Sequence, residues 1–181
     1  MNIFVLDPAP QVAARNLCDK HVVKMIVESA QMMSTAHRVL DGEPTTRVTK
    51  TGRNVKHWDH SNQTLCLATM VHHPCTQWVM RTNKNYLWLY QHASAMLMEY
   101  NLRYHKIHAM EKLISVHLSS CPKNIPLGDL TPFAQAMPDK YRSEDAVTAY
   151  RNYYLGDKAR FAKWKNVQAP NWWIEGVQIG E

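Results

Sequence analysis

Apolar residues recur at helical spacing along most of the chain, and this pattern predicts a mainly helical protein. The first helical pattern covers residues 11–40, with a joint near 16–19. The longest uninterrupted pattern covers residues 85–106, where Leu89, Ala93, Met96 and Tyr100 fall on one stripe. Shorter helices are predicted over residues 62–71, 74–81, 109–119 and 144–165, the last capped by Ser143.

The segments between these patterns have other signatures. Residues 3–6 are apolar and predict either a strand-like lead-in or a buried arm. Residues 41–60 lose the periodicity and predict a long loop or a small hairpin, while the proline-rich residues 120–142 predict an extended loop. The tryptophan-containing tail at 169–173 is expected to pack back on the helices. We therefore expect an all-α fold, a compact single-domain helical bundle with long irregular loops, spanning residues 1–181.

Composition narrows the classes of function. With 21 Lys and Arg against 15 Asp and Glu, the net charge of +6 favours a phosphate-bearing partner, either duplex DNA or a nucleotide. No apolar run has the length of a membrane span and no export signal opens the chain, so we expect a cytoplasmic protein without a membrane partner. The sequence lacks a P-loop, a dinucleotide-binding glycine pattern and a nucleophile elbow, which argues against ATPase, dehydrogenase and α/β-hydrolase activities. No cofactor is expected. The 10 histidines show no metal-site spacing, so no metal is expected either.

The first long helix carries a narrow polar stripe. Its members are spaced 3, 4, 3, 4 and 3 residues apart and are His21, Lys24, Glu28, Gln31, Thr35 and Arg38. Such spacing confines them to a face roughly 100° wide, while apolar residues fill most of the rest. The stripe is either a solvated face with a Lys24–Glu28 pair or the wall of a site. In a site, Glu28 would act as general acid or base and Lys24 as an amine or anion clamp.

Two other regions hold polar clusters. The helix over residues 85–106 places Asn85, His92, Glu99, Arg103 and Lys106 near one another, and the Glu99–Arg103 pair is typical of a structural role. The segment 47–56 contains Arg47, Lys50, Arg53 and Lys56. It is either a phosphate-contacting element or a solvated loop.

Residues 19–28, DKHVVKMIVE, resemble the first helix of the phage pyrimidine-dimer DNA glycosylases of the endonuclease V type. There an Asp-x-His-aliphatic-aliphatic run also precedes a functional Glu at the same spacing. Residues 73–103 and the MPDKYR segment at 137–142 resemble later parts of that family in the same order, and together the matches cover roughly half of the chain. The CDKHVVKM start also resembles a group of tailed-phage proteins. That similarity implies a viral origin and the cytoplasm of an infected host cell.

This resemblance implies a compact all-α, endonuclease V-like fold that binds duplex DNA. It also implies base excision through an imine between an amine and the sugar C1′, followed by β-elimination, the chemistry of a glycosylase and abasic-site lyase. Glu28 is the position that carries over directly. The family uses the α-amine of a small residue exposed by methionine removal, but here Asn2 follows Met1, and a residue that large usually leaves the methionine in place. Either the α-amine of Met1 or Lys24 would then be the nucleophile, or the imine chemistry is absent.

The candidate catalytic residues are Glu28, Lys24, His21 and Met1. The candidate nucleic-acid or phosphate contacts are Gln31, Arg38, Lys50, Arg53, Lys56, His73, Arg81, Asn85 and Arg103. Two alternatives stay open. The first is a transferase that modifies a DNA base on the same scaffold. The second is a non-catalytic protein that captures a nucleotide signal and blunts a host defence. The sequence does not fix the oligomeric state.

Overall fold

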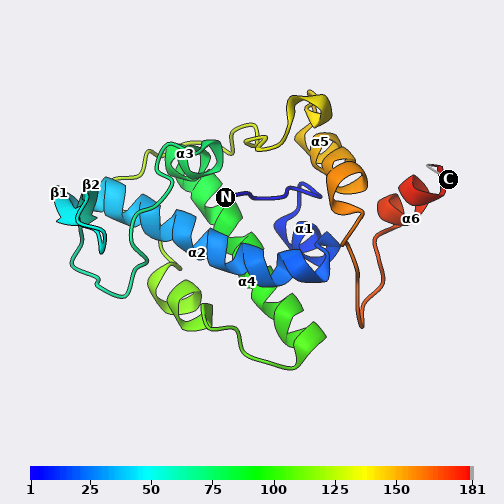
Figure 1. Ribbon diagram of the computed structural model, residues 1–181, viewed down its shortest axis with the longest axis horizontal. Helices are drawn as coiled ribbons and strands as arrows, with labels where there is room; N and C mark the ends of the chain where they lie inside the picture. The colour runs from blue at the N-terminus through cyan, green and yellow to red at the C-terminus, as the bar shows by residue number, and fades with distance from the viewer. Residues whose placement is uncertain (180–181) are drawn as a thin grey trace.

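Helices form most of the protein in a computed structural model that describes residues 1–179 (Figure 1). In chain order the elements are α1 (Pro10–Asn16), α2 (Asp19–Asp41), β1 (Glu43–Val48), β2 (Asn54–Asp59), α3 (Pro74–Arg81), α4 (Asn83–Tyr104), the π-helical turn η1 (Leu113–His117), the short 3-10 turn η2 (Asp139–Tyr141), α5 (Ala146–Tyr153), the π-helical turn η3 (Tyr154–Lys158) and α6 (Asn171–Ile179). The expected all-α class is confirmed. None of the helices within residues 1–179 is long and apolar enough to cross a membrane.

The two long helices α2 and α4 cross at the centre of the molecule (Figure 1). Helix α1 packs on α4, and α3 contacts both α2 and α4. The wide apolar arc of α2 explains this position, because Met25, Ile26, Met32 and Met33 all lie within the core. The predicted joint in the first helical pattern is also confirmed, since α1 ends at Asn16 and α2 begins at Asp19.

The N-terminal segment is a buried arm rather than a strand. Ile3, Phe4, Val5 and Leu6 are 0–4% exposed, so the arm runs through the core. A buried backbone needs hydrogen-bond partners, and here Asn2 supplies some of them: its Oδ1 accepts from the backbone N–H groups of Ile3 at 2.8 Å and Phe4 at 3.0 Å. The arm thereby fixes the position of the chain's first residue.

The predicted hairpin is confirmed, whereas the helix predicted over residues 62–71 is wrong. Strands β1 and β2 pair antiparallel from Glu43 opposite Asp59 to Val48 opposite Asn54. The next segment is irregular because side chains of α2 bind its backbone. Arg38 donates to the carbonyls of Leu65 and Cys66, and Thr35 Oγ1 accepts from the N–H of Thr69. These long-range bonds replace the hydrogen bonds that a local helix would make.

The helices predicted in the C-terminal half are shorter than expected. The helix expected from Glu144 to Lys165 is α5 followed by η3, and Asp145 rather than Ser143 caps it by accepting from two backbone N–H groups. Beyond η3, the chain is bound to the start of α2, where Asp19 accepts from the N–H of Lys165 at 2.7 Å. The helix expected over residues 109–119 contains the π-helical turn η1. The tail does pack back, since Trp172 of α6 contacts Tyr154 of η3.

Candidate active site

The site centres on Glu28, in the middle of α2. The α-amine of Met1 lies 3.6 Å from Glu28 Oε2, and Lys24 Nζ lies 3.0 Å from Oε1. The Glu28 side chain is 12% exposed and that of Met1 only 4%, whereas Lys24 is 67% exposed. The site therefore combines the α-amine of a partly exposed residue, one largely sheltered carboxylate and one solvated amine, with the carboxylate and the solvated amine one turn apart on α2.

The buried arm delivers the α-amine to this place. Asn2 binds the backbone of the arm through Oδ1, and its Nδ2 donates to the carbonyl of Ala136 at 2.8 Å. Since the next four residues are buried in the core, the first residue cannot shift without moving the arm. The amine is thus held in place by tertiary structure, which is what a nucleophile needs if it is to meet a reacting atom in a fixed geometry.

The carboxylate of Glu28 has unused hydrogen-bonding capacity. Its Oε2 is shielded from solvent and has no hydrogen-bond partner among residues 1–179, because 3.6 Å to the Met1 amine exceeds hydrogen-bond length. A carboxylate beside an amine can take the ammonium proton, which leaves a neutral nucleophile, and can return a proton later. The pair can therefore act as nucleophile and general acid–base.

His73 extends the site from α2 to α3. It is the N-cap of α3, where its Nδ1 accepts from the N–H of Cys75 at 3.2 Å. Burial lowers the pKa of His73 below its usual value, and the positive α-amine of Met1 lowers it further, while the Glu28 carboxylate acts in the opposite sense. The imidazole is thus electrostatically coupled to both groups of the candidate site.

His73 also lines a surface pocket of about 660 Å³ between the hairpin and residues 68–73. The pocket wall combines apolar, aromatic and cationic side chains, including Arg47, Lys56, Trp58 and Met70. Its volume lies within the range of about 300–1,000 Å³ that small-molecule sites occupy. Lys56 Nζ lies 4.9 Å from the ring centre of Trp58, so a cation and a stacking surface are available together.

The structure brings together only some of the predicted site residues. Met1, Lys24 and Glu28 are in contact, and His73 lies close enough to be coupled to Met1 and Glu28. His21 lies elsewhere: its ring stacks on Phe4 with centroids 4.3 Å apart and its Nδ1 binds the hydroxyl of Tyr154. Burial, together with the nearby positive lysines, lowers the pKa of His21 to about 3, so this residue is a neutral core group.

Three of the predicted phosphate contacts are buried and bound to other groups. Arg38 donates to three backbone carbonyls, Asn85 binds Trp78 O and Thr131, and Arg103 binds Glu99, Asp19 and two carbonyls of the segment before α2. Each is at most 3% exposed. The exposed candidates are Lys50, Arg53 and Lys56 on the hairpin and Arg81 at the end of α3, and Gln31 is partly exposed on α2.

Two features of the site were missed by the sequence analysis. The pocket depends on the irregular path of residues 62–71, for which the periodicity predicted a helix. The anchoring role of Asn2 had a local signal, since a short amide side chain often binds the backbone N–H groups that follow it. That signal predicts a turn but not the element against which the turn packs.

Comparison with protein families gives one finding. Residues 1–112 match the family described as pyrimidine dimer DNA glycosylase. The matched region runs from the buried arm to just beyond α4, so it contains Met1, Lys24, Glu28 and His73. Comparisons with curated proteins and with solved structures yield no match.

Proposed function

The chain belongs to the pyrimidine dimer DNA glycosylase family, and from this premise we propose that it excises damaged pyrimidines from duplex DNA with the α-amine of Met1 as nucleophile and Glu28 as general acid–base. The observation that carries the proposal is the 3.6 Å approach of the Met1 α-amine to the largely buried carboxylate of Glu28. Two groups 27 positions apart in sequence meet there, and the resemblance implies the same two kinds of group.

The proposed reaction begins with proton transfer from the Met1 ammonium to Glu28. The neutral amine attacks C1′, the C1′–base bond breaks and the base leaves with its electron pair, taking up the proton that the newly bonded nitrogen gives up. Glu28 then protonates the ring oxygen O4′, so that the sugar opens to an imine with the α-amine. Loss of a C2′ proton drives β-elimination of the 3′ phosphate, and water finally hydrolyses the imine and releases the enzyme.

Charge on the surface supports duplex DNA as the partner. Lys50, Arg53 and Lys56 are exposed on the hairpin and Arg81 is exposed at the end of α3. Such side chains would contact phosphates, which position a protein on DNA without reading its sequence. Gln31 lies one turn beyond Glu28 and would contact the DNA bound at the active site. From the tailed-phage resemblance, we further propose that this activity operates in the cytoplasm of an infected cell.

Borohydride trapping tests the proposal. Intact mass first establishes that Met1 carries the free amine in the purified protein. The protein is then mixed with duplexes carrying a thymine dimer, an abasic site or no lesion, and borohydride reduces any imine to a stable adduct. We expect a lesion-dependent adduct that peptide mapping assigns to Met1.

Matched variants separate the two amines. One added glycine before Met1 should abolish the adduct because it displaces the amine, whereas Lys24→Arg should retain it. Lys20→Arg, another exposed lysine of α2, is the control. An adduct on Lys24 would overturn the assignment of Met1, and the absence of any adduct alongside strand cleavage would overturn the imine mechanism.

A second function, nucleotide capture without catalysis, is favoured by one observation. The pocket beside His73 offers Trp58 for stacking and Arg47 and Lys56 for phosphate in about 660 Å³. This alternative predicts stoichiometric binding of a nucleotide that is recovered unchanged, together with weak binding to duplex DNA. Calorimetry with a nucleotide panel and the trapping assay distinguish the two, because only the glycosylase forms a covalent adduct.

A further inference from the structure

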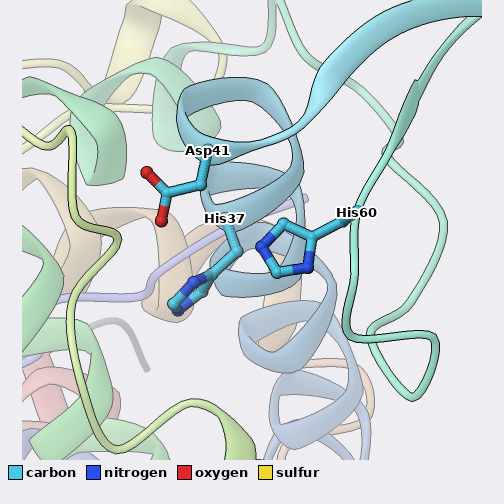
Figure 2. Close-up of side chains that lie close together, drawn as sticks. All are labelled: His37, Asp41 and His60. Carbon is cyan, nitrogen blue, oxygen red and sulfur yellow. The ribbon is translucent and has the colours of Figure 1, made fainter.

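Three potential metal ligands converge at the base of the hairpin, away from the candidate active site. His37 and Asp41 lie one turn apart at the end of α2, and His60 directly follows β2 (Figure 2). One ligand atom from each residue lies within 4.8 Å of the other two. Sequence spacing did not indicate this cluster. His37 and Asp41 are four residues apart on one helix, but the third ligand, His60, lies 19 positions after Asp41.

The hydrogen bonds of His37 prepare it as a ligand. Its Nε2 lies 3.1 Å from the carbonyl oxygen of Ser120 and 2.9 Å from the hydroxyl of Tyr86, which itself donates to Leu118 O. Both oxygens therefore accept, so Nε2 carries the proton and Nδ1 keeps its lone pair. No hydrogen bond to Nδ1 occurs within the described part of the chain. A histidine whose second nitrogen donates to a carbonyl is the usual arrangement around bound metals.

Asp41 is held in place while retaining capacity for a metal. Its two oxygens accept from the backbone N–H groups of Lys123 at 2.8 Å and Asn124 at 2.9 Å. A carboxylate offers about four lone-pair positions, so about two remain. The carboxylate is thereby oriented by a loop from another part of the chain, as a ligating carboxylate commonly is.

Hydrogen bonds and a close backbone approach hold the hairpin against the end of α2, where the three ligands meet. Arg38 donates to the carbonyls of Trp58 and Leu65, on either side of His60 in sequence. At Gly42 a Cβ would lie 2.5 Å from both Arg38 O and Asp59 O, so only glycine lets the strand leave the helix at this close approach. The third ligand is therefore brought to the helix end by contacts that do not depend on a metal.

We propose that His37, Asp41 and His60 form a binding site for a first-row divalent metal of the zinc class, which fastens the hairpin to the end of α2. Two imidazoles and one carboxylate favour such metals over magnesium or calcium, which prefer oxygen ligands. Bonds of about 2.0–2.2 Å imply ligand separations near 3.4 Å, so the three groups must converge by at most about 1.4 Å. Water fills the remaining position.

The site lies beyond the proposed excision chemistry. His37 is nine residues from Glu28, about 13.5 Å along the helix, so its metal would not touch the reacting sugar. It would instead order the hairpin that carries Lys50, Arg53 and Lys56.

His60 supplies a distinctive readout. Its Nδ1 accepts from the N–H of Asn62 at 3.0 Å, so the neutral ring carries its proton on Nε2. Coordination through Nε2 moves that proton to Nδ1 and breaks the Asn62 bond. Metal binding should therefore accelerate hydrogen exchange at the Asn62 amide while the amides of Lys123 and Asn124 remain protected.

The test uses untagged protein stripped with a chelator and titrated with Co²⁺ and Zn²⁺. We expect one equivalent of Co²⁺ to give visible d–d bands that Zn²⁺ bleaches, with a rise in melting temperature. His60→Ala, a partly exposed position, should weaken binding at least 100-fold and remove the thermal shift. His105→Asn, an exposed histidine at the left-handed end of α4, should leave binding unchanged.

Each result of this titration either supports the metal site or refutes it. Binding that survives in His60→Ala, or that falls equally in His105→Asn, would overturn the site, as would the absence of stoichiometric binding in the wild-type protein. Because His37 is buried, Asp41→Asn provides the second ligand variant, and its circular dichroism spectrum verifies that it folds. Loss of metal binding in that variant supports the site, and unchanged affinity refutes the role of Asp41.

Discussion

Replacing Glu28 by glutamine should separate catalysis from folding. The substitution keeps the size of the side chain but removes the negative charge that faces the Met1 amine at 3.6 Å and Lys24 at 3.0 Å. In the proposed mechanism the Glu28 carboxylate takes the ammonium proton, and the resulting carboxylic acid later protonates the sugar oxygen. The amide of glutamine can do neither.

The expected effects differ in size. Lys24 is 67% exposed, so its pair with Glu28 contributes about 0.3–0.5 kcal/mol, as exposed i,i+4 pairs do. Glu28 Oε2 makes no hydrogen bond to lose, and we expect the free energy of unfolding to fall by only about 1–2 kcal/mol. Loss of a general acid–base typically costs about 10²–10⁴-fold in rate, or roughly 2.7–5.4 kcal/mol in the barrier.

The assay measures excision in a single turnover, with enzyme in excess over a duplex carrying one thymine dimer. Fluorescence anisotropy gives the affinity for the same duplex, and urea denaturation gives the free energy of unfolding. Lys24→Gln is the matched control, because it removes the same ion pair and leaves the carboxylate. We expect it to slow excision by less than about 10-fold.

Two results would refute this reasoning. If Glu28→Gln excises the dimer within about 10-fold of the wild-type rate, the carboxylate is not the general acid–base. If excision, DNA affinity and the free energy of unfolding all fall together, Glu28 is a structural residue.

Three further predictions concern stability and DNA binding. Burial lowers the pKa of both His21 and His92 to about 3, so the unfolded chain binds more protons than the native one between pH 6.5 and 3. The free energy of unfolding should thus fall as the pH drops through that window, by about 2 kcal/mol per histidine at pH 5. Denaturation of His92→Leu at pH 7 and pH 5 should show a smaller change in this free energy than the wild-type protein does. An unchanged pH dependence would contradict a lowered pKa for His92. Arg103→Met should lower the free energy of unfolding by about 3–5 kcal/mol because it removes a buried cation and leaves two partly buried carboxylates and two backbone carbonyls without it. A loss below about 1 kcal/mol would show that those groups are hydrated. Replacing Lys50 and Arg53 by serine should reduce the slope of log affinity for duplex DNA against log salt by about 1–2, whereas an unchanged slope would place the DNA elsewhere.

Local patterns accounted for much of the architecture. The sequence predicted a helix whose surface is mostly apolar outside a narrow polar stripe, and Met25 and Met33 of α2 are in the core. The break near Asn16 and the loss of periodicity after Leu40 correctly predicted where α1 ends and where the hairpin begins. These features follow from side-chain spacing within one turn or one strand, so the sequence alone carries them.

Elements governed by distant contacts were not predicted. The polar stripe of α2 was expected to face one side as a set, yet Glu28 meets the Met1 amine whereas Arg38 is enclosed by backbone carbonyls. His21, on the same stripe, lies under Phe4. The stripe divides because α2 is surrounded by different elements along its length, and only their packing decides what each polar residue touches.

The sequence by itself determined the helical class, the family and the position of one candidate catalytic glutamate, because each depends on residues close together in the chain. Only the tertiary structure decided that this glutamate faces the α-amine, that residues 68–71 line a pocket instead of forming a helix, and that His60 meets His37 and Asp41. Those outcomes depend on hydrogen bonds and burial between segments tens of residues apart, and no local spacing encodes them.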